Sequence, residues 1–381
     1  MKENNLNELK TAIVHDWLAE YAGSERCTES FTNLWPGADI FTLVDILNDE
    51  QRKIVLKGKH PQTSFIQKLP FARKNHRIYL PLFPYAIEQF DLSDYKLIIS
   101  SSHAIAKGVL TRYDQLHICY CHTPIRYAWD LYFRYLEDAG IKSGIKGWYV
   151  KRTLHKMRLW DVLASRRPDY LIANSNHIAK RIKKIYDRDA DVIYPPVDVG
   201  KFSIGTQKEN YYLTVSRFTN YKRIDLIVRA FNNMPDKKLV VVGGGAEEKK
   251  IKSIAGKNIE VLPFQEQDSV KQLMQKAKAF VFAADEDFGI VVVEAMACGT
   301  PVIAWNGGGT KESVLNGETG ILFPEQSAES IVNAVKEFEK TENKFSPEII
   351  RNHSEKFSRK NFENKIREFV SEKSEIHFQK S

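Results

Sequence analysis

Cysteine is scarce in this chain of 381 residues. The four cysteines are Cys27, Cys119, Cys121 and Cys298, and no two of them form a C-x-x-C pair. So few thiols, without that spacing, argue against the disulfide framework of a small secreted protein. We therefore expect a reducing, cytosolic compartment.

Long apolar segments are also missing. No hydrophobic run approaches the roughly 18 residues of a membrane-spanning helix, and no charged-then-apolar signal segment opens the sequence. The sequence has no internal repeat, no low-complexity tract and no His, Cys and carboxylate cluster at metal-ligand spacing. Two D-x-D strings, at 189–191 and 285–287, are interpreted as charged turns, so we expect no metal and no other cofactor.

Acidic residues are few between positions 142 and 188. This segment holds thirteen Lys and Arg against three Asp, a balance of +10 (13 − 3) that exceeds the +8 of the whole chain. A block of this kind predicts affinity for polyanions, a class that includes nucleic acid, nucleotide phosphates and anionic lipid.

The chain does contain two series of short apolar segments that alternate with helical stretches. The length suggests two domains, and the alternation predicts a parallel sheet in each. Two prolines within 194–198 favour extended chain and mark the linker. The expected strands are Thr11–Trp17, Ile40–Val44, Leu97–Ser100, Ile118–Cys121 and Tyr170–Asn174 before the linker, and Tyr211–Val215, Leu239–Gly243, Ile259–Pro263, Phe280–Ala284, Pro301–Trp305 and Gly320–Phe323 after it.

The stretch from 280 to 302 carries the densest pattern. An apolar strand is followed by the acidic turn 285–287 and by an Ala-rich run that predicts a helix from about Ile290. This places Glu286 in a loop at the carboxyl end of a strand and Glu294 in the next helix. Ligands bind at that edge of open α/β sheets, where a helix start offers unpaired N–H groups to an anion. The two carboxylates are thus suited to hold hydroxyls of two parts of one phosphate-bearing ligand.

The string E-D-F-G-I-V-V-V-E-A-M-A-C-G-T-P-V resembles the E-x7-E signature of retaining glycosyltransferases of family 4. The resemblance implies the GT-B fold, an α/β architecture with two Rossmann-like domains facing each other across a cleft. It also implies a C-terminal helix that crosses back to the N-terminal domain. We accordingly predict an acceptor domain at 1–197 plus 356–381 and a nucleotide-sugar domain at 198–355.

The same resemblance assigns roles around the signature. It implies that Glu286 orients the transferred sugar and that Glu294 holds the ribose of the donor. Phe288, Gly289 and Ile290, which open the helix, belong to the donor-binding set.

Arg217 and Lys222 follow the first strand of the second domain. A guanidinium and an ammonium five residues apart suit a diphosphate, although a solvated basic loop fits the spacing equally well. The S-R-F-x-x-Y-K string resembles the family's paired basic residues, which implies that both bind the diphosphate and stabilise the leaving group. Arg223 is interpreted as a bystander.

Three further features of the second domain lie at strand ends. Gly243, in the glycine run 243–245, permits close approach of a nucleotide or of neighbouring chain, and a tight turn explains it equally well. Phe264 borders the donor base by its position in the family. The glycine loop 307–309 is interpreted as flexible and ligand-facing.

Two residues of the first domain join the candidate site. Gly23 can let the backbone approach a phosphate and Ser24 can cap a helix, although a plain tight turn is as consistent with the sequence. The resemblance implies that Gly23 belongs to a loop that faces the donor diphosphate. His122, in the string H-T-P after a strand, is a structural histidine by default, because it lacks partners for metal or base chemistry. The resemblance implies that it positions the sugar.

Four strings of the first half narrow the resemblance: HDWLAEYAGSER, TSFIQKLP, YLPLFPYAIEQFDLSDYKLIISSSHAIAKGV and HICYCHTPIRYAWDLY. They are similar to bacterial mannosyltransferases that use GDP-mannose in O-antigen and related polysaccharide assembly. The implied acceptor is a polyprenyl-diphosphate-linked glycan at the cytoplasmic leaflet. Cations and aromatics interleave at 69–85 and 144–160, which suits peripheral contact with a membrane, although a core helix with a solvated basic face fits equally.

Other readings remain open. A UDP-sugar donor or a nucleotide-sugar epimerase would use the same fold, whereas a pyridoxal phosphorylase would need a Schiff-base lysine for which no distinct context is visible. A nucleic-acid-binding protein would use the basic block and tolerate changes at Glu286. We do not expect nucleic acid as a partner, because the strand-end residues are arranged for a nucleotide ligand.

Overall fold

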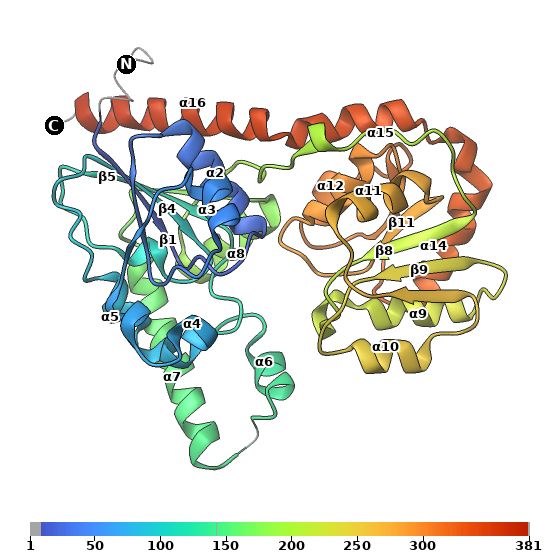
Figure 1. The fold of residues 1–381 in the computed structure, drawn as a ribbon, viewed down its shortest axis with the longest axis horizontal. Helices are drawn as coiled ribbons and strands as arrows, with labels where there is room; N and C mark the ends of the chain where they lie inside the picture. Colours follow the sequence, from blue (N-terminus) through green and yellow to red (C-terminus); the bar gives the residue numbers. More distant parts are fainter. Residues whose placement is uncertain (1–8, 142, 380–381) are drawn as a thin grey trace. The chain divides into compact units, whose positions relative to one another are not determined.

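The computed structural model describes residues 9–141 and 143–379, which form two compact α/β units (Figure 1). The chain passes from unit 1 to unit 2 after Pro195 and returns to unit 1 after Asn361. No helix among the described residues is both long enough and apolar enough to cross a bilayer. The predicted α/β class with two parallel sheets is confirmed.

Unit 1 is built on a seven-stranded parallel sheet with the strand order β3-β2-β1-β4-β5-β6-β7. The order reverses between β1 and β4, and ligands of open α/β sheets bind at such a switch point. The strands are β1 Thr11–His15, β2 Asp39–Thr42, β3 Gln62–Thr63, β4 Leu97–Ser102, β5 Leu116–Cys121, β6 Tyr170–Ala173 and β7 Asp191–Val192.

Helices connect these strands. Asn48 and Ser175 accept backbone N–H groups at the starts of α3 and α8, as N-cap residues do. The α-helices are α2 Gly23–Leu34, α3 Asp49–Leu56, α4 Ala72–Asn75, α5 Phe83–Ile87, α6 Tyr132–Asp138, α7 Gly144–Ala164 and α8 Asn176–Tyr186, and the 3-10 helices are η1 Phe65–Lys68, η2 His76–Leu82 and η3 Ala106–Gly108.

Unit 2 repeats the plan with six parallel strands in the order β10-β9-β8-β11-β12-β13. Here the order reverses between β8 and β11. The strands are β8 Tyr211–Val215, β9 Lys238–Val242, β10 Ile259–Leu262, β11 Ala279–Phe282, β12 Val302–Trp305 and β13 Gly320–Phe323. The α-helices are α9 Ile224–Asn232, α10 Glu248–Ile254, α11 Gln267–Lys276, α12 Ile290–Ala297, α13 Thr310–Ser313, α14 Ala328–Thr341 and α15 Pro347–Ser354, and the 3-10 helices are η4 Val199–Lys201, η5 Asn220–Lys222, η6 Glu342–Lys344 and η7 Glu355–Phe357.

The last helix, α16 (Arg359–Gln379), begins in unit 2 and continues into unit 1. Its buried residues Phe362, Ile366 and Val370 join the unit 1 core, where Phe362 packs on Phe31 of α2. Phe357, just before this helix, contacts Phe288 of unit 2 instead, so the aromatic side chains of the tail divide between the units.

All eleven expected strands exist, with borders that differ by one or two residues at most ends. The sequence reading missed β3 and β7, which contain two residues each. Such short pairings leave no apolar run to recognise, because they lie at the two edges of the sheet and are only partly covered.

Candidate functional sites at two sheet edges

Two loops meet at the switch point of the unit 2 sheet. β8 and β11 are hydrogen-bonded neighbours, and their carboxyl ends lead to Arg217 and Lys222 on one side and to Glu286 on the other. Lys222, at the end of η5, forms an ion pair with Glu286, and each side chain keeps about a sixth of its surface exposed (15% and 17%). The structure thus brings together two residues that lie 64 positions (286 − 222) apart in the chain.

A glycine loop supports the acidic turn from behind. The N–H of Gly309 donates to the carbonyl oxygen of Glu286 over 2.7 Å. A Cβ at Gly308 would lie 2.6 Å from that same oxygen, and one at Gly309 would lie 2.0 Å from the carbonyl oxygen of Asp287. The expectation of a flexible ligand-facing loop at 307–309 is wrong in this respect: the glycines allow close packing that fixes the backbone of the turn.

The second glycine run has the same kind of role. Gly243 has φ +145°, and a Cβ there would lie 1.9 Å from the carbonyl oxygen of Ser216. The N–H of Phe218 donates to the carbonyl of Gly244 over 2.7 Å. Of the alternatives for Gly243, the structure therefore favours close approach of neighbouring chain, since residues 243–245 pack against the loop that carries Arg217.

Helix α12 starts where the signature predicted. Gly289 is its N-cap with φ +87°, Ile290 is its first residue, and Glu294 lies half-buried one turn further on. The ring of Phe288 is buried 5.4 Å from the ring of Phe357, so only its backbone is left to meet a ligand. The helix start leaves backbone N–H groups without intrahelical partners, which suits an oxyanion.

Arg217 and Phe264 are the exposed members of the predicted set. Arg217 is exposed in the loop after β8, and the Phe264 side chain, which follows β10, is 76% exposed. Because β9 separates β10 from β8, Phe264 stands about 10 Å to the side of the switch point.

At the corresponding edge of unit 1, His122 follows β5 and is buried. Its Nε2 lies 2.9 Å from the Ser101 hydroxyl, and its backbone N–H donates to the carbonyl of Ser102. Burial lowers the pKa of His122 to about 3, assisted by the neighbouring His103 and His15. The imidazole is therefore neutral at physiological pH, which fits a positioning role.

Asp16 and His103 form a dyad beside it, across the switch point between β1 and β4. The Asp16 carboxylate accepts four backbone N–H bonds of 2.5–2.8 Å from residues 103–106, and its Oδ2 lies 2.9 Å from Nδ1 of His103. Burial alone would raise the pKa of Asp16, but His103 and these bonds hold it well below its ordinary value. Burial likewise opposes the charge on His103, yet Asp16 raises its pKa above the ordinary value. Asp16 thus favours the charged form of His103, and His103 favours the charged form of Asp16.

A third group links His122 to α2. Nε2 of His15 lies 3.4 Å from Glu25 in the first turn of that helix, while its Nδ1 lies 3.1 Å from the Ser101 hydroxyl. Ser101 therefore joins His15 to His122. Burial tends to raise the pKa of Glu25, but the bond from His15 gives a net lowering.

Gly23 is the first residue of α2, at the carboxyl end of β1. The proposed Ser24 cap is wrong, since the N-cap is Ala22 and its N–H donates to the Glu25 carboxylate over 3.1 Å. Ser24 lies within the first turn and donates to the same carboxylate. The helix start therefore occupies the place expected for a phosphate-facing loop, and contact of Gly23 with a phosphate stays a prediction.

Sequence reasoning missed His15, Asp16, Glu25 and His103 as site residues. A signal was present: polar residues end β1 and β4, in H-D and S-S-S-H, as they end β5 in C-H. Because β1, β4 and β5 are adjacent in the sheet, residues that follow them meet at one edge. That adjacency is a property of the strand order and could not be read from the separate strings.

Comparisons with known proteins identify the fold. Residues 44–201 match the family model "Glycosyltransferase Family 4", and residues 200–361 match "Glycosyl transferases group 1". Residues 44–361 belong to these two families of glycosyltransferase domains. Together the two matches span most of this chain, and the second contains Arg217, Lys222 and both carboxylates of the E-x7-E string.

Curated relatives align over part of their length. A D-inositol 3-phosphate glycosyltransferase of Mycobacteroides abscessus is 29% identical over 194 residues, which is 44% of this chain and 44% of the relative. An uncharacterized glycosyltransferase of Methanocaldococcus jannaschii is 31% identical over 187 residues, 48% of this chain and 50% of the relative. The chain thus spans about half the length of the curated relatives that it matches.

Solved structures match the whole architecture. Anabaena HepE, crystallised with UDP and glucose, gives a TM-score of 0.69 at 16% identity, covering 95% of this chain and 99% of HepE. Sucrose-phosphate synthase of Thermosynechococcus elongatus gives 0.70 at 17% identity, covering 95% and 98%. At these identities the likeness shows the GT-B fold alone. Within the part of the chain that the structure describes, no group of three or more His, Cys, Asp and Glu side chains is placed to hold a metal ion.

Proposed function

We propose that this protein is a retaining glycosyltransferase that moves a hexose from a nucleotide sugar to a lipid-linked glycan. The Lys222–Glu286 pair at the unit 2 switch point carries this proposal. It joins a cation suited to a diphosphate with a carboxylate suited to sugar hydroxyls. A bound donor that contacts both side chains replaces their ion pair: its diphosphate pairs with Lys222 and its sugar hydroxyls bond to Glu286.

In the proposed mechanism the charge that develops on the leaving diphosphate is stabilised by Arg217 and Lys222, with the α12 helix start beside them. Glu294 holds the ribose and Glu286 orients the sugar. His122, neutral and hydrogen-bonded to Ser101, positions the sugar from unit 1. No protein nucleophile is required when the acceptor hydroxyl attacks from the side of the leaving group.

The proposed donor is GDP-mannose, as the strings of the first half suggest. UDP-sugars are the second candidate, because HepE was solved with UDP and glucose. A thermal-shift panel of GDP-mannose, UDP-glucose, GDP and UDP separates them, since a ligand that binds only the folded state raises the melting temperature. A shift with UDP compounds alone would exclude the GDP-mannose assignment.

Turnover tests the diphosphate site. Arg217→Ala should lower kcat/KM by at least about tenfold, because a charge-assisted hydrogen bond to the leaving group is lost. Arg229→Ala, on the exposed side of α9, is the matched control and should keep wild-type turnover. Undiminished turnover by the Arg217 variant would overturn the assignment.

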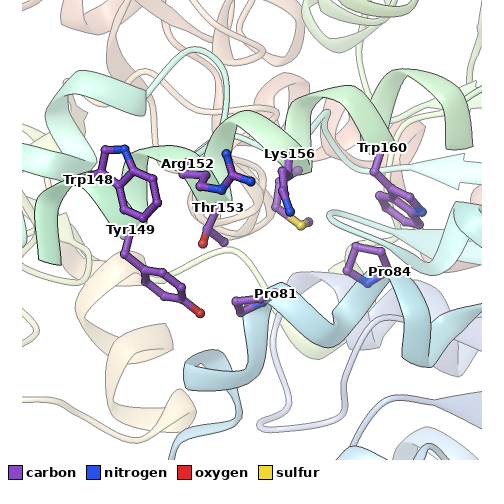
Figure 2. Close-up of a pocket in the computed structure, with 9 residues that line it drawn as sticks. Pro81, Pro84, Trp148, Tyr149, Arg152, Thr153, Lys156 and Trp160 are labelled. Carbon is purple, nitrogen blue, oxygen red and sulfur yellow. The ribbon is translucent and has the colours of Figure 1, made fainter. Parts of the chain in front are cut away.

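We further propose that unit 1 contacts the membrane through α7. The groove between α7 and the segment formed by η2 and α5 has a volume of about 520 Å³ (Figure 2). Trp148 and Tyr149 form part of its wall with more than half of each side chain exposed. Arg152 and Lys156 also line it, and its lining contains no acidic side chain.

Aromatic side chains interleaved with cations suit a headgroup layer, and each basic residue near anionic lipid contributes about 1 kcal/mol. The acceptor in this proposal, a polyprenyl-diphosphate-linked glycan, lies at such a surface.

Vesicle flotation tests the membrane contact. Wild-type protein should float with vesicles of phosphatidylglycerol and phosphatidylcholine and much less with phosphatidylcholine alone. The double variant Arg152→Glu/Lys156→Glu should lose most of the difference, whereas Lys249→Glu/Lys257→Glu in unit 2 should retain it. Equal flotation of the two double variants would contradict a docking role for α7.

A further inference from the structure

The Asp16–His103 dyad has no role in the mechanism above, although it lies at the switch point of unit 1. His103 follows β4 directly and belongs to the sheet edge that also carries His122, whose ring centroid is 6.3 Å away. Its place in the sheet is therefore that of a ligand-facing residue, and its partners define what it can do there.

One ring nitrogen of His103 faces a buried carboxylate. Nδ1 lies 2.9 Å from Asp16, whose side chain is completely buried and held by four backbone N–H groups. Trp17 packs edge-on against the imidazole with centroids 4.5 Å apart and an interplanar angle of 86°. The ring is thus fixed in position and orientation from two sides.

The other ring nitrogen is left for a ligand. A quarter of the His103 side chain is exposed, and no hydrogen bond to its Nε2 is formed by the protein atoms of residues 9–141 and 143–379. With Nδ1 within 2.9 Å of the Asp16 carboxylate, a charged ring presents Nε2–H as a donor to solvent. A fixed cationic donor at a sheet edge recognises an oxyanion.

We propose that His103 is a substrate-binding residue whose Nε2 donates a hydrogen bond to a phosphate oxygen of the bound ligand, with Asp16 as its positioning residue. This inference rests on the proposed function, because that function supplies ligands with phosphates: the nucleoside diphosphate of the donor and the lipid diphosphate of the acceptor. The shared chemistry is a phosphate oxyanion.

The protonation of His103 links this contact to pH. The charged form is favoured by Asp16 and Glu25 and opposed by burial and by Arg77. Since the charged ring is the better anion donor, affinity for a phosphate ligand should fall as pH rises through the pKa of His103. The titratable or charged groups that face His103 are Asp16 after β1, His15 on β1, Glu25 on α2, His122 after β5, and His76 and Arg77 on η2.

The test measures binding of three probes by calorimetry: GDP or UDP for the donor, farnesyl diphosphate for the acceptor, and inorganic phosphate. His103→Gln keeps a polar side chain but carries no titratable charge. It should weaken at least one probe about tenfold at pH 6.5, since a charge-assisted hydrogen bond is lost, and should flatten its pH dependence. The probe affected identifies the source of the phosphate. The control His60→Gln, an exposed histidine of unit 1, should bind as wild type does.

Asp16→Asn tests the positioning role through proton NMR of the His103 ring. Its pKa should lie above 6.5 in wild type and fall in the variant, because the charge of the carboxylate is removed. This readout does not depend on activity. Should Asp16→Asn fail to fold, the His103→Gln binding data decide alone.

Two outcomes overturn the inference, and they differ in scope. Wild-type protein that binds nucleotides while His103→Gln leaves all affinities and pH profiles unchanged contradicts the role of His103 only. Wild-type protein that binds none of the probes contradicts the proposed function as well.

Discussion

The two switch points of this protein differ in how their polar groups are held. In unit 1, His15, Asp16 and Glu25 are each less than 5% exposed and bonded to one another or to backbone. In unit 2, Lys222 and Glu286 keep about a sixth of their surface exposed. Both edges follow the same topology, so the difference comes from the side chains.

This difference indicates that the two edges have different roles in ligand binding. A buried, saturated network has a fixed shape and can only present the atoms at its boundary, such as Nε2 of His103. A partly exposed ion pair can exchange its partners for those of a ligand at modest cost, because solvent already reaches both charges. Unit 1 is thus suited to positioning and unit 2 to gripping a charged donor.

The largest expected effect tests whether unit 1 depends on its buried charges. Lys107 and Asp161 are both fully buried and form an ion pair of 2.6 Å. Lys107→Ala leaves the Asp161 charge in the core and should lower the free energy of unfolding by about 3–5 kcal/mol. Urea unfolding followed by tryptophan fluorescence checks this, since five of the six tryptophans lie before residue 195.

The exposed pair between Lys96 and Asp114 provides the control for that measurement. Lys96→Ala should cost far less stability than Lys107→Ala, because the Asp114 charge stays at the surface and still pairs with Arg112. Similar losses in the two variants would remove the distinction between buried and exposed pairs in unit 1.

The next effect concerns the packing that supports the unit 2 loops. Gly243→Ala should lower the free energy of unfolding by roughly 3 kcal/mol, because its Cβ would lie 1.9 Å from the Ser216 carbonyl oxygen at a strained φ. Gly317→Ala, at φ +84° in open space, should cost only about 1–2 kcal/mol. Thermal unfolding of both variants gives the ratio, and equal costs would show that the close approach does not constrain the loop.

Glu286→Ala sharpens the functional side of the comparison. Transfer should fall by at least about 100-fold, because the sugar loses its orienting carboxylate, while nucleotide affinity should stay nearly unchanged. Initial rates with the donor, together with calorimetry with its nucleoside diphosphate, separate the two effects. The exposed Glu318→Ala is the control. A variant that loses nucleotide affinity in step with its rate would assign Glu286 to the nucleotide instead.

A fall in pH should destabilise unit 1 more than unit 2. Burial lowers the pKa of His117 and His122 to about 3 and that of His76 to about 4, from 6.5. Each therefore contributes stability that is complete above pH 6.5 and is lost as pH falls toward the folded value, by at most about 1.4 kcal/mol per pH unit. His103, whose pKa is raised, has the opposite sign and offsets part of this loss.

Unit 2 provides the comparison, because His353 is the one histidine in the sequence from 196 to 361, and burial lowers its pKa too. Unit 1 should lose stability more steeply than unit 2 between pH 6.5 and about 4. Hydrogen exchange corrected for intrinsic rates and resolved by unit measures both slopes, and parallel slopes would contradict the burial of the unit 1 histidines.

Much of unit 2 was predictable because its signals are local. The strand before the acidic turn, the helix start near Ile290 and the strand Tyr211–Val215 were expected and are present. The flexible loop expected at 307–309 failed for a tertiary reason, since its glycines are required by the backbone of a turn more than twenty residues earlier. In unit 1 the four backbone hydrogen bonds to Asp16 could not be predicted, because their donors lie 87 to 90 positions away in the chain.

The sequence alone determined that the chain alternates strand and helix in two series, because apolar runs and their breakers act within a few residues. It also determined that a helix starting near Ile290 carries Glu294. Only the tertiary structure decided which strand ends meet: it paired Lys222 with Glu286 and Asp16 with His103. The physical reason is that strand order in a parallel sheet depends on how the crossover helices pack, and that packing sums weak contacts across the whole unit.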